Sequence, residues 1–157
     1  MDSYLLLKLI HIISAVVVVG TGVGIAFFML MAFRSKNLPA IYITAKHVIL
    51  GDWIFTTPAI LTLLVSGILL MNKLGYSISS PWFHWVMGLF ILMGVCWIPV
   101  LFIQYRLRDL SHTLLSSEEL TGNFANLMKI WISLGIVAFA AVGTIFWLMV
   151  FKPFSVV

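Results

Sequence analysis

The sequence predicts an all-α integral membrane protein, an up-down bundle of four transmembrane helices in one compact domain. Of its 157 residues, 62% are hydrophobic and only 9% are charged, and the mean hydropathy is +1.16. A membrane-spanning helix needs about 20 apolar residues, so the chain has room for four or five passes and little else. Long uncharged runs alternate with short segments that carry the charges. This composition excludes a soluble domain and makes the lipid bilayer the main partner.

The first span is expected from about residue 4 to residue 33, because no residue between Lys8 and Arg34 is charged. It has neither a basic leader nor a small-residue cleavage site, so we expect it to be retained. Gly20 and Gly24 form a small-xxx-small pair. Such a pair lets another helix approach closely, either within this chain or in a homodimer.

The remaining spans are expected at about residues 47–73, 81–106 and 129–151. The turn-rich stretch GYSISSP ends the second span, and Pro81 suits the first turn of the third. Pro58 and Pro99 lie inside the second and third spans and should kink them.

A polar segment joins the third span to the fourth. Ser116 or Ser117, ahead of Glu119, predicts the capped start of a short interfacial helix, with Gly122 as a break after it. This segment is short, so the bundle needs no long crossover.

Basic residues predict the orientation. With four passes, Lys8, Lys73 and Lys152 share one side, and the opposite side has Arg34, Lys36, Lys46, Arg106, Arg108 and Lys129. The positive-inside rule then places both termini in the periplasm of a bacterial inner membrane. The net charge of +4 reflects this topology, so we infer no nucleic-acid partner from it.

Asp52 and Cys96 are two unusual side chains within apolar runs. Asp52 lies near the inner end of the second span, where Lys46 or Lys129 could neutralise it, and we prefer such a structural pair to a proton relay. Cys96 is the single cysteine, so no intrachain disulfide can form, and we interpret it as a small buried hydrophobe.

His11 is the strongest candidate for function, because an ionisable side chain inside a membrane span usually marks a site. His84, in the stretch PWFHW, lies on the same side of the membrane in the third span. The first and third spans of an up-down bundle are diagonal, with axes about 11–14 Å apart, and a metalloporphyrin with an imidazole on each face needs about that gap. Lys8 shares a helical face with His11 and could hold a haem propionate.

Several alternatives stay open. Met71, Met87 or Met149 could replace one imidazole on haem iron. His47 and His112 lie nearer the opposite membrane surface and fit ordinary interfacial roles. The histidines of the spans could also serve only to hydrogen-bond one helix to another.

Four stretches resemble HemJ-type protoporphyrinogen oxidases, small four-helix membrane proteins that bind haem b: YLLLKLIHIISAV, TTPAILTLLVSGILL, PWFHW and FKPF. The stretches CWIPVLFIQYRLRDL and TIFWLMVFKP are more similar to a related bacterial family of predicted integral membrane proteins with no assigned activity. The resemblance implies that His11 is a haem ligand. The HemJ pattern reads roughly Trp-x-His-x-Lys in the third helix, and Val86 stands at the lysine position here. The resemblance therefore implies the haem-binding fold without that oxidase chemistry.

The sequence as a whole favours a haem b-binding inner-membrane protein, with His11 and His84 as iron ligands and Lys8 beside the cofactor. Its role would be redox chemistry or electron transfer with a membrane donor or acceptor. The competing interpretation is a non-enzymatic scaffold or small transport component whose histidines bridge helices.

Overall fold

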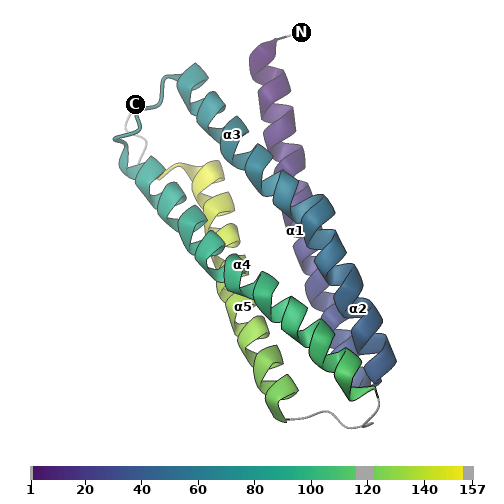
Figure 1. Cartoon of the computed structure of the whole chain (residues 1–157). Coiled ribbons are helices and arrows are strands. Elements are labelled where there is room, and N and C mark those ends of the chain that lie inside the picture. The colour runs from purple at the N-terminus through teal and green to yellow at the C-terminus, as the bar shows by residue number, and fades with distance from the viewer. Residues whose placement is uncertain (1, 116–121, 154–157) are drawn as a thin grey trace.

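The structure, a computed structural model, describes residues 2–115 and 122–153. The helices are α1 (Ser3–Ser35), α2 (Leu38–Gly51), the short π-helical segment η1 (Asp52–Thr56), α3 (Thr57–Leu74), α4 (Pro81–Leu114) and α5 (Gly122–Phe151). Because α2, η1 and α3 are continuous, they form one long rod, and the described residues contain four helices long and apolar enough to cross a membrane. The predicted all-α, up-down bundle is confirmed (Figure 1).

The spans pair off along the bundle. α1 packs against α3 and α2, whereas α4 packs against α5 and α2. In Figure 1 the start of α1, the end of α5 and the α3–α4 turn lie at the top, and the α1–α2 turn lies at the bottom; we call these the upper and lower ends. α1 and α4 do not pack along each other in the described structure, so they occupy the expected diagonal positions.

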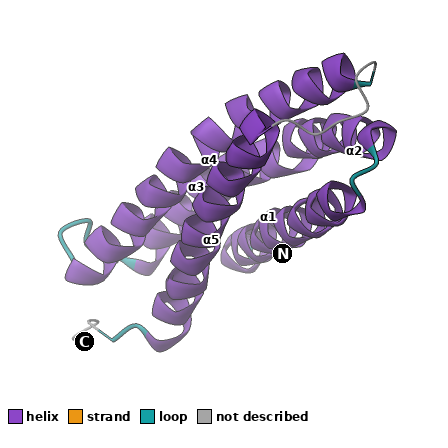
Figure 2. Cartoon of the chain, turned by 90° about the horizontal axis from the view of Figure 1, so that it is seen from below, coloured by secondary structure: helices purple, strands orange, loops and turns teal. Residues whose placement is uncertain are grey.

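The packed core lies in the lower half. Met29 from α1, Ile41 from α2, Leu107 from α4, and Phe124 and Met128 from α5 are almost fully buried in one cluster. Figure 2 shows the same helices seen from below. Since the close packing is concentrated here, the upper half has room for a cavity between the two helix pairs.

Local sequence explains the helix ends. Asn37 caps α2 by accepting a hydrogen bond from the backbone N–H of Ala40 at 3.0 Å. Ser80 caps α4 in the same way, with the backbone N–H of Phe83 at 3.3 Å, and Pro81 occupies the first turn as expected. Gly75 ends α3 in a left-handed conformation, with φ of 69°, which glycine adopts without a Cβ penalty.

Three spans extend beyond their expected bounds. The second begins at Leu38 rather than near residue 47. α4 continues to Leu114 rather than stopping near residue 106, and α5 has begun by Gly122 rather than near residue 129. Leu107, Ser111 and Leu114 on this extension are buried, so tertiary packing keeps the polar stretch helical. The expected cap at residues 116–119 lies outside the described residues.

Proline affects the two central spans differently. Just before Pro58, the chain forms the π-helical turn η1, and the carbonyl oxygen of Asp52 accepts from the backbone N–H of Thr57 and, at 2.8 Å, from the Thr57 hydroxyl. The missing N–H of proline leaves the helix ladder incomplete, and a π-turn is a common accommodation. α4, by contrast, continues through Pro99 without interruption.

No described residue makes the close helix approach expected at Gly20 and Gly24, since both Cβ positions have nothing within 4 Å. Gly22 instead lies against a side chain of α5, and an added Cβ there would be 3.0 Å from the Cζ of Phe139. The periodicity of α1 puts Gly20 and Gly24 on one face and Gly22 on the opposite one.

Candidate functional site

A cavity of about 500 Å³ occupies the upper half of the bundle, between the α1–α3 pair and the α4–α5 pair. Its volume lies within the usual range for small-molecule sites, about 300–1,000 Å³. The walls are mainly apolar and include Ile12, Leu63, Phe83, Phe90 and Phe146. We call it the upper cavity.

His11 is a polar group in this wall, and its hydrogen bonds fix its orientation. Its Nδ1 lies 2.9 Å from the hydroxyl oxygen of Ser66 on α3, and that hydroxyl donates to the carbonyl oxygen of Thr62 at 2.6 Å. With the hydroxyl hydrogen of Ser66 on the Thr62 carbonyl oxygen, we assign Nδ1–H of His11 as the donor to Ser66. Nε2 then carries the free lone pair, which is the state of a metal-binding imidazole.

Gly67 lets the imidazole lie close against α3. An added Cβ at this position would be 3.2 Å from Cε1 of His11 and 3.7 Å from Nδ1. Any larger residue would push the ring away from Ser66. The sequence SG at positions 66 and 67 therefore supplies both the hydrogen bond and the space for His11.

Four polar side chains line the upper end of the cavity: Tyr4, Lys8, Tyr76 and Lys152. The ammonium of Lys152 donates to the hydroxyl of Tyr76 at 2.8 Å, and Lys8 Nζ lies 5.8 Å from the ring centroid of Tyr4. Two cations at one end of an apolar cavity fit a ligand with an apolar body and an anionic edge.

The structure brings together only part of the predicted ligand set. Lys8 and His11 line the same cavity, but His84 is exposed, does not line it, and has its Nδ1 2.9 Å from the carbonyl oxygen of Ser80 in its own helix. Helical periodicity explains this difference: the face of α4 that carries Phe83 and Val86 points into the cavity, so His84 points away from it.

The three methionines considered as alternative ligands all line the upper cavity. Met71 comes from α3, Met87 from α4 and Met149 from α5. Thioether sulfur is a known axial ligand of haem iron. His47 and His112, which were predicted to have interfacial roles, are exposed, and neither lines the upper cavity.

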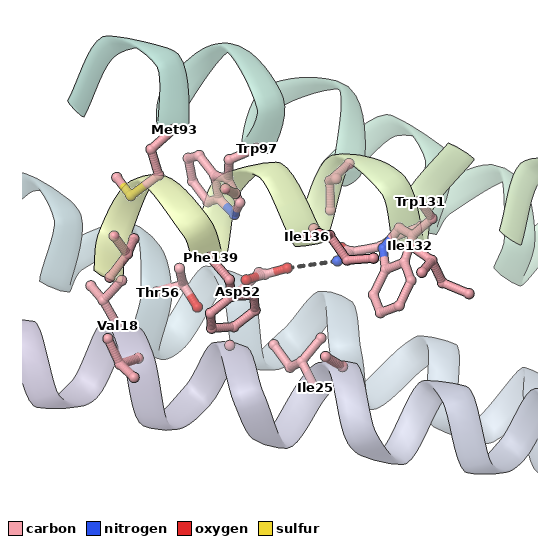
Figure 3. A pocket seen from close by; sticks show the side chains of 18 of the residues that line it. Val18, Ile25, Asp52, Thr56, Met93, Trp97, Trp131, Ile132, Ile136 and Phe139 are labelled. Atoms are coloured by element: carbon pink, nitrogen blue, oxygen red, sulfur yellow. Dashed lines mark hydrogen bonds between the residues drawn. The ribbon is translucent and has the colours of Figure 1, made fainter. Parts of the chain in front are cut away.

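A second cavity, of about 360 Å³, lies in the lower half and is lined in part by Asp52 (Figure 3). We call it the lower cavity. The expected ion pair of Asp52 with Lys46 or Lys129 is wrong, because the described residues hold no basic side chain within 4.0 Å of its carboxyl group. Its Oδ2 instead accepts from Nε2 of Gln104 on α4 at 2.8 Å. The π-turn at η1 helps to place Asp52 inside the bundle.

Sequence reasoning missed the polar residues around Asp52. Thr56 lies one helical turn after Asp52, and Trp97 and Gln104 lie two turns apart on α4. This spacing, together with Gln104 as an uncharged polar residue in an apolar span, was the available signal. It could show that each pair shares a helix face, but not that the two faces meet.

No three His, Cys, Asp or Glu side chains in the described parts of the chain come together as a metal-binding group. A ligand set made only of protein side chains is therefore not formed there. Haem iron needs at most two protein ligands, because the porphyrin supplies the other four.

In a comparison with known protein families, residues 5–153 match the family described as Predicted integral membrane protein (DUF2269). The chain belongs to this family. The match extends over all four spans of this DUF2269 protein and over both cavities. No curated protein and no solved structure matches the chain. The predicted membership in a family of integral membrane proteins is confirmed, and the multi-pass character agrees with the four spans.

Proposed function

We propose that this DUF2269 protein binds one b-type haem in the upper cavity and uses it for electron transfer or another redox reaction. The observation that carries the proposal is the orientation of His11. Its Nδ1 is held at 2.9 Å by Ser66, which leaves Nε2 as the ligand atom in the wall of a cavity of about 500 Å³.

The rest of the cavity fits the group. Apolar and aromatic walls suit a porphyrin face, and Lys8 and Lys152 lie at the upper end, where they would hold the two propionates. This arrangement would place the ring with its carboxylate edge toward the membrane surface. An anionic edge beside two cations avoids burying an unpaired charge in the bilayer.

We propose the second iron ligand from the residues that line the upper cavity. His84 was expected there, but in this structure it would have to turn into the cavity from an exposed face of α4. Met87 and Met149 already line the cavity on the side opposite α1 and α3. We therefore propose His11 with one of these methionines, and keep His84 as the alternative that the experiment below separates.

A bound haem would supply a one-electron redox centre, and the chain sets its properties. Ser66 orients the His11 ring and, by accepting from Nδ1–H, increases the donor strength of Nε2. The apolar walls exclude water, and a methionine ligand raises the reduction potential relative to a second imidazole. Val86 lines the cavity where the HemJ-type pattern has lysine, so the wall there carries no cation.

An absorption spectrum tests the proposal. Protein purified in detergent after expression with sufficient haem should show a Soret band, and the His11→Ala variant should lose it. His47→Ala and His112→Ala are the matched controls, because both histidines are exposed and should leave the band intact. A full Soret band in the His11→Ala protein would refute the proposed ligand.

Carbon monoxide distinguishes the second ligands. The gas binds reduced haem when an axial ligand is weak or missing, so we compare spectra with carbon monoxide for Met87→Leu, Met149→Leu and His84→Ala. We expect one methionine variant to bind it faster than the parent protein and His84→Ala to behave as the parent. Faster binding only in His84→Ala would favour the imidazole pair.

A scaffold role is the second candidate, and one observation favours it. The His11–Ser66 hydrogen bond joins α1 to α3, which is what a purely structural membrane histidine does. Absence of any Soret band from protein expressed with sufficient haem would support this role. Under either proposal we place the protein in a bacterial inner membrane with both termini periplasmic, on the distribution of basic residues.

A further inference from the structure

The lower cavity gathers buried polar atoms that have no hydrogen-bond partner. They are the hydroxyl of Thr56, the indole nitrogens of Trp97 and Trp131, and Oε1 of Gln104. Thr56, Gln104 and Trp131 are only 5%, 2% and 6% exposed, and Asp52 is 4% exposed. A buried polar group without a partner is costly, and four around one cavity indicate that something else supplies the partners.

The arrangement of these groups is asymmetric. Asp52, Thr56 and Trp97 lie together on one side of the cavity, and the dashed bond in Figure 3 runs from Asp52 to the amide of Gln104. Thr56 and Trp97 lie beside the Asp52 carboxyl group without reaching hydrogen-bond geometry. Trp131 lies beyond the other end of this bond, and the rest of the lining is apolar and includes Val18, Ile25, Ile136 and Phe139 (Figure 3). One end of a ligand would thus meet polar atoms while its body meets hydrocarbon.

The polar atoms demand a specific kind of partner. The two indole N–H groups can only donate, so each needs an acceptor: Trp97 lies beside the Asp52 carboxyl group, whereas Trp131 needs an acceptor on the ligand. Oε1 of Gln104 can only accept, so it needs a donor. A ligand that satisfies both must carry a donor and an acceptor at its polar end, and a hydroxyl group on an aromatic ring does so.

We propose that the lower cavity binds a membrane hydroquinone, with its hydroxyl-bearing ring at the polar side and its alkyl tail along the apolar walls. One ring hydroxyl donates to Gln104 or Asp52 and accepts from Trp97 or Trp131, and the flat ring packs against the indoles and Phe139. This site is separate from the upper cavity and does not rest on haem binding.

Other ligand classes fit less well. An organic cation would pair with Asp52 but would leave the indole N–H of Trp131 without an acceptor. A fatty acid would bring its carboxylate beside the carboxyl group of Asp52, and no lysine or arginine is among the residues that line the cavity. Water alone could satisfy the polar atoms, and the experiment includes that outcome.

Binding of a decyl-substituted benzoquinol to the purified full chain in detergent, measured by isothermal titration calorimetry under anaerobic reducing conditions, tests the proposal. The matched ligand is the same compound with both hydroxyls methylated, which keeps the shape and tail but removes the donors. We expect the methylated compound to bind about 10- to 100-fold more weakly, because Oε1 of Gln104 then has no donor.

Variants locate the binding site. Gln104→Leu and Trp97→Phe should each weaken quinol binding about tenfold or more, whereas Trp85→Phe, an exposed tryptophan outside the cavity, should not. Circular dichroism of each variant checks that the helices remain folded, and Trp97→Phe, which keeps an aromatic ring, is the variant least disturbing to packing. Equal affinity for quinol and methylated compound, or for a decylammonium ion and quinol, overturns the proposal. No measurable quinol binding overturns it as well.

Discussion

A Ser66→Ala variant removes one oxygen atom from the interface between α1 and α3. That oxygen is the partner of Nδ1 of His11 at 2.9 Å, and Ser66 is only 3% exposed. The variant leaves a partly buried imidazole N–H without an acceptor. Its cost has two parts: the interhelical hydrogen bond, and the bond of the Ser66 hydroxyl to its own helix at 2.6 Å.

The expected magnitude follows from the setting. An orphaned buried polar group costs about 1–3 kcal/mol, but interhelical hydrogen bonds in membrane proteins average about 0.6 kcal/mol and reach about 1.7. We expect Ser66→Ala to lower the free energy of unfolding by about 1 kcal/mol. The matched control is Ser14→Ala, because Ser14 is also buried and its hydroxyl bonds only to the carbonyl of Ile10 in its own helix, at 2.8 Å. The control should cost about half as much or less.

The assay is equilibrium unfolding in mixed detergent micelles, with a double-mutant cycle that combines Ser66→Ala and His11→Ala. A coupling energy of about 0.6 kcal/mol is expected, because the two side chains contact each other directly. If the protein retains haem, Ser66→Ala should also lower the haem affinity about 10- to 100-fold, as is typical when the hydrogen-bond partner of a ligating histidine is lost. A coupling energy of zero, with Ser66→Ala no more costly than Ser14→Ala, would refute the His11–Ser66 hydrogen bond and the reasoning built on it.

Two further predictions concern helix packing and topology. Gly67→Ala should reduce stability relative to Gly88→Ala, because its Cβ would lie 3.2 Å from Cε1 of His11 whereas the Cβ position of Gly88 has nothing within 4 Å; unfolding in the same micelles measures both, and equal stabilities would contradict the close packing of the imidazole. In intact cells, a membrane-impermeant maleimide should label Ser79→Cys, in the upper turn, but should label Ser35→Cys only after permeabilisation, since the native cysteine of both variants is buried. Preferential labelling at position 35 in intact cells would reverse the orientation.

Much of the fold was accessible from hydropathy because the bilayer permits so few solutions. Every backbone polar group must be satisfied within the membrane, so long apolar runs become helices. The turn at GYSISSP and Pro81 also followed from local chemistry, as the Ser80 cap shows. The ends of α4 and α5 could not be read in the same way, because burial at Leu107 and Phe124, not local polarity, keeps those turns helical.

The candidate site residues also divide into those that local sequence indicated and those that depend on how the helices pack. His11 was visible as an imidazole in an oily run, and Lys8 as its neighbour one turn away, because both facts are local. His84 was expected on the same side of the membrane as His11, but its position around the axis of α4 turns it away from the upper cavity. Depth is a property of the sequence, whereas rotation about the helix axis depends on which face finds a partner.

The sequence by itself therefore determined the class of protein, the four spans and their alternating direction, and it drew attention to one histidine inside a span. Only the tertiary structure decided that Ser66 holds this imidazole, and that Asp52 faces Gln104 rather than a lysine. The physical reason is the sequence separation between the residues that interact. Hydropathy and capping act within a few residues, whereas these two hydrogen bonds join residues 55 and 52 positions apart and exist only when helices pack with their polar positions facing each other.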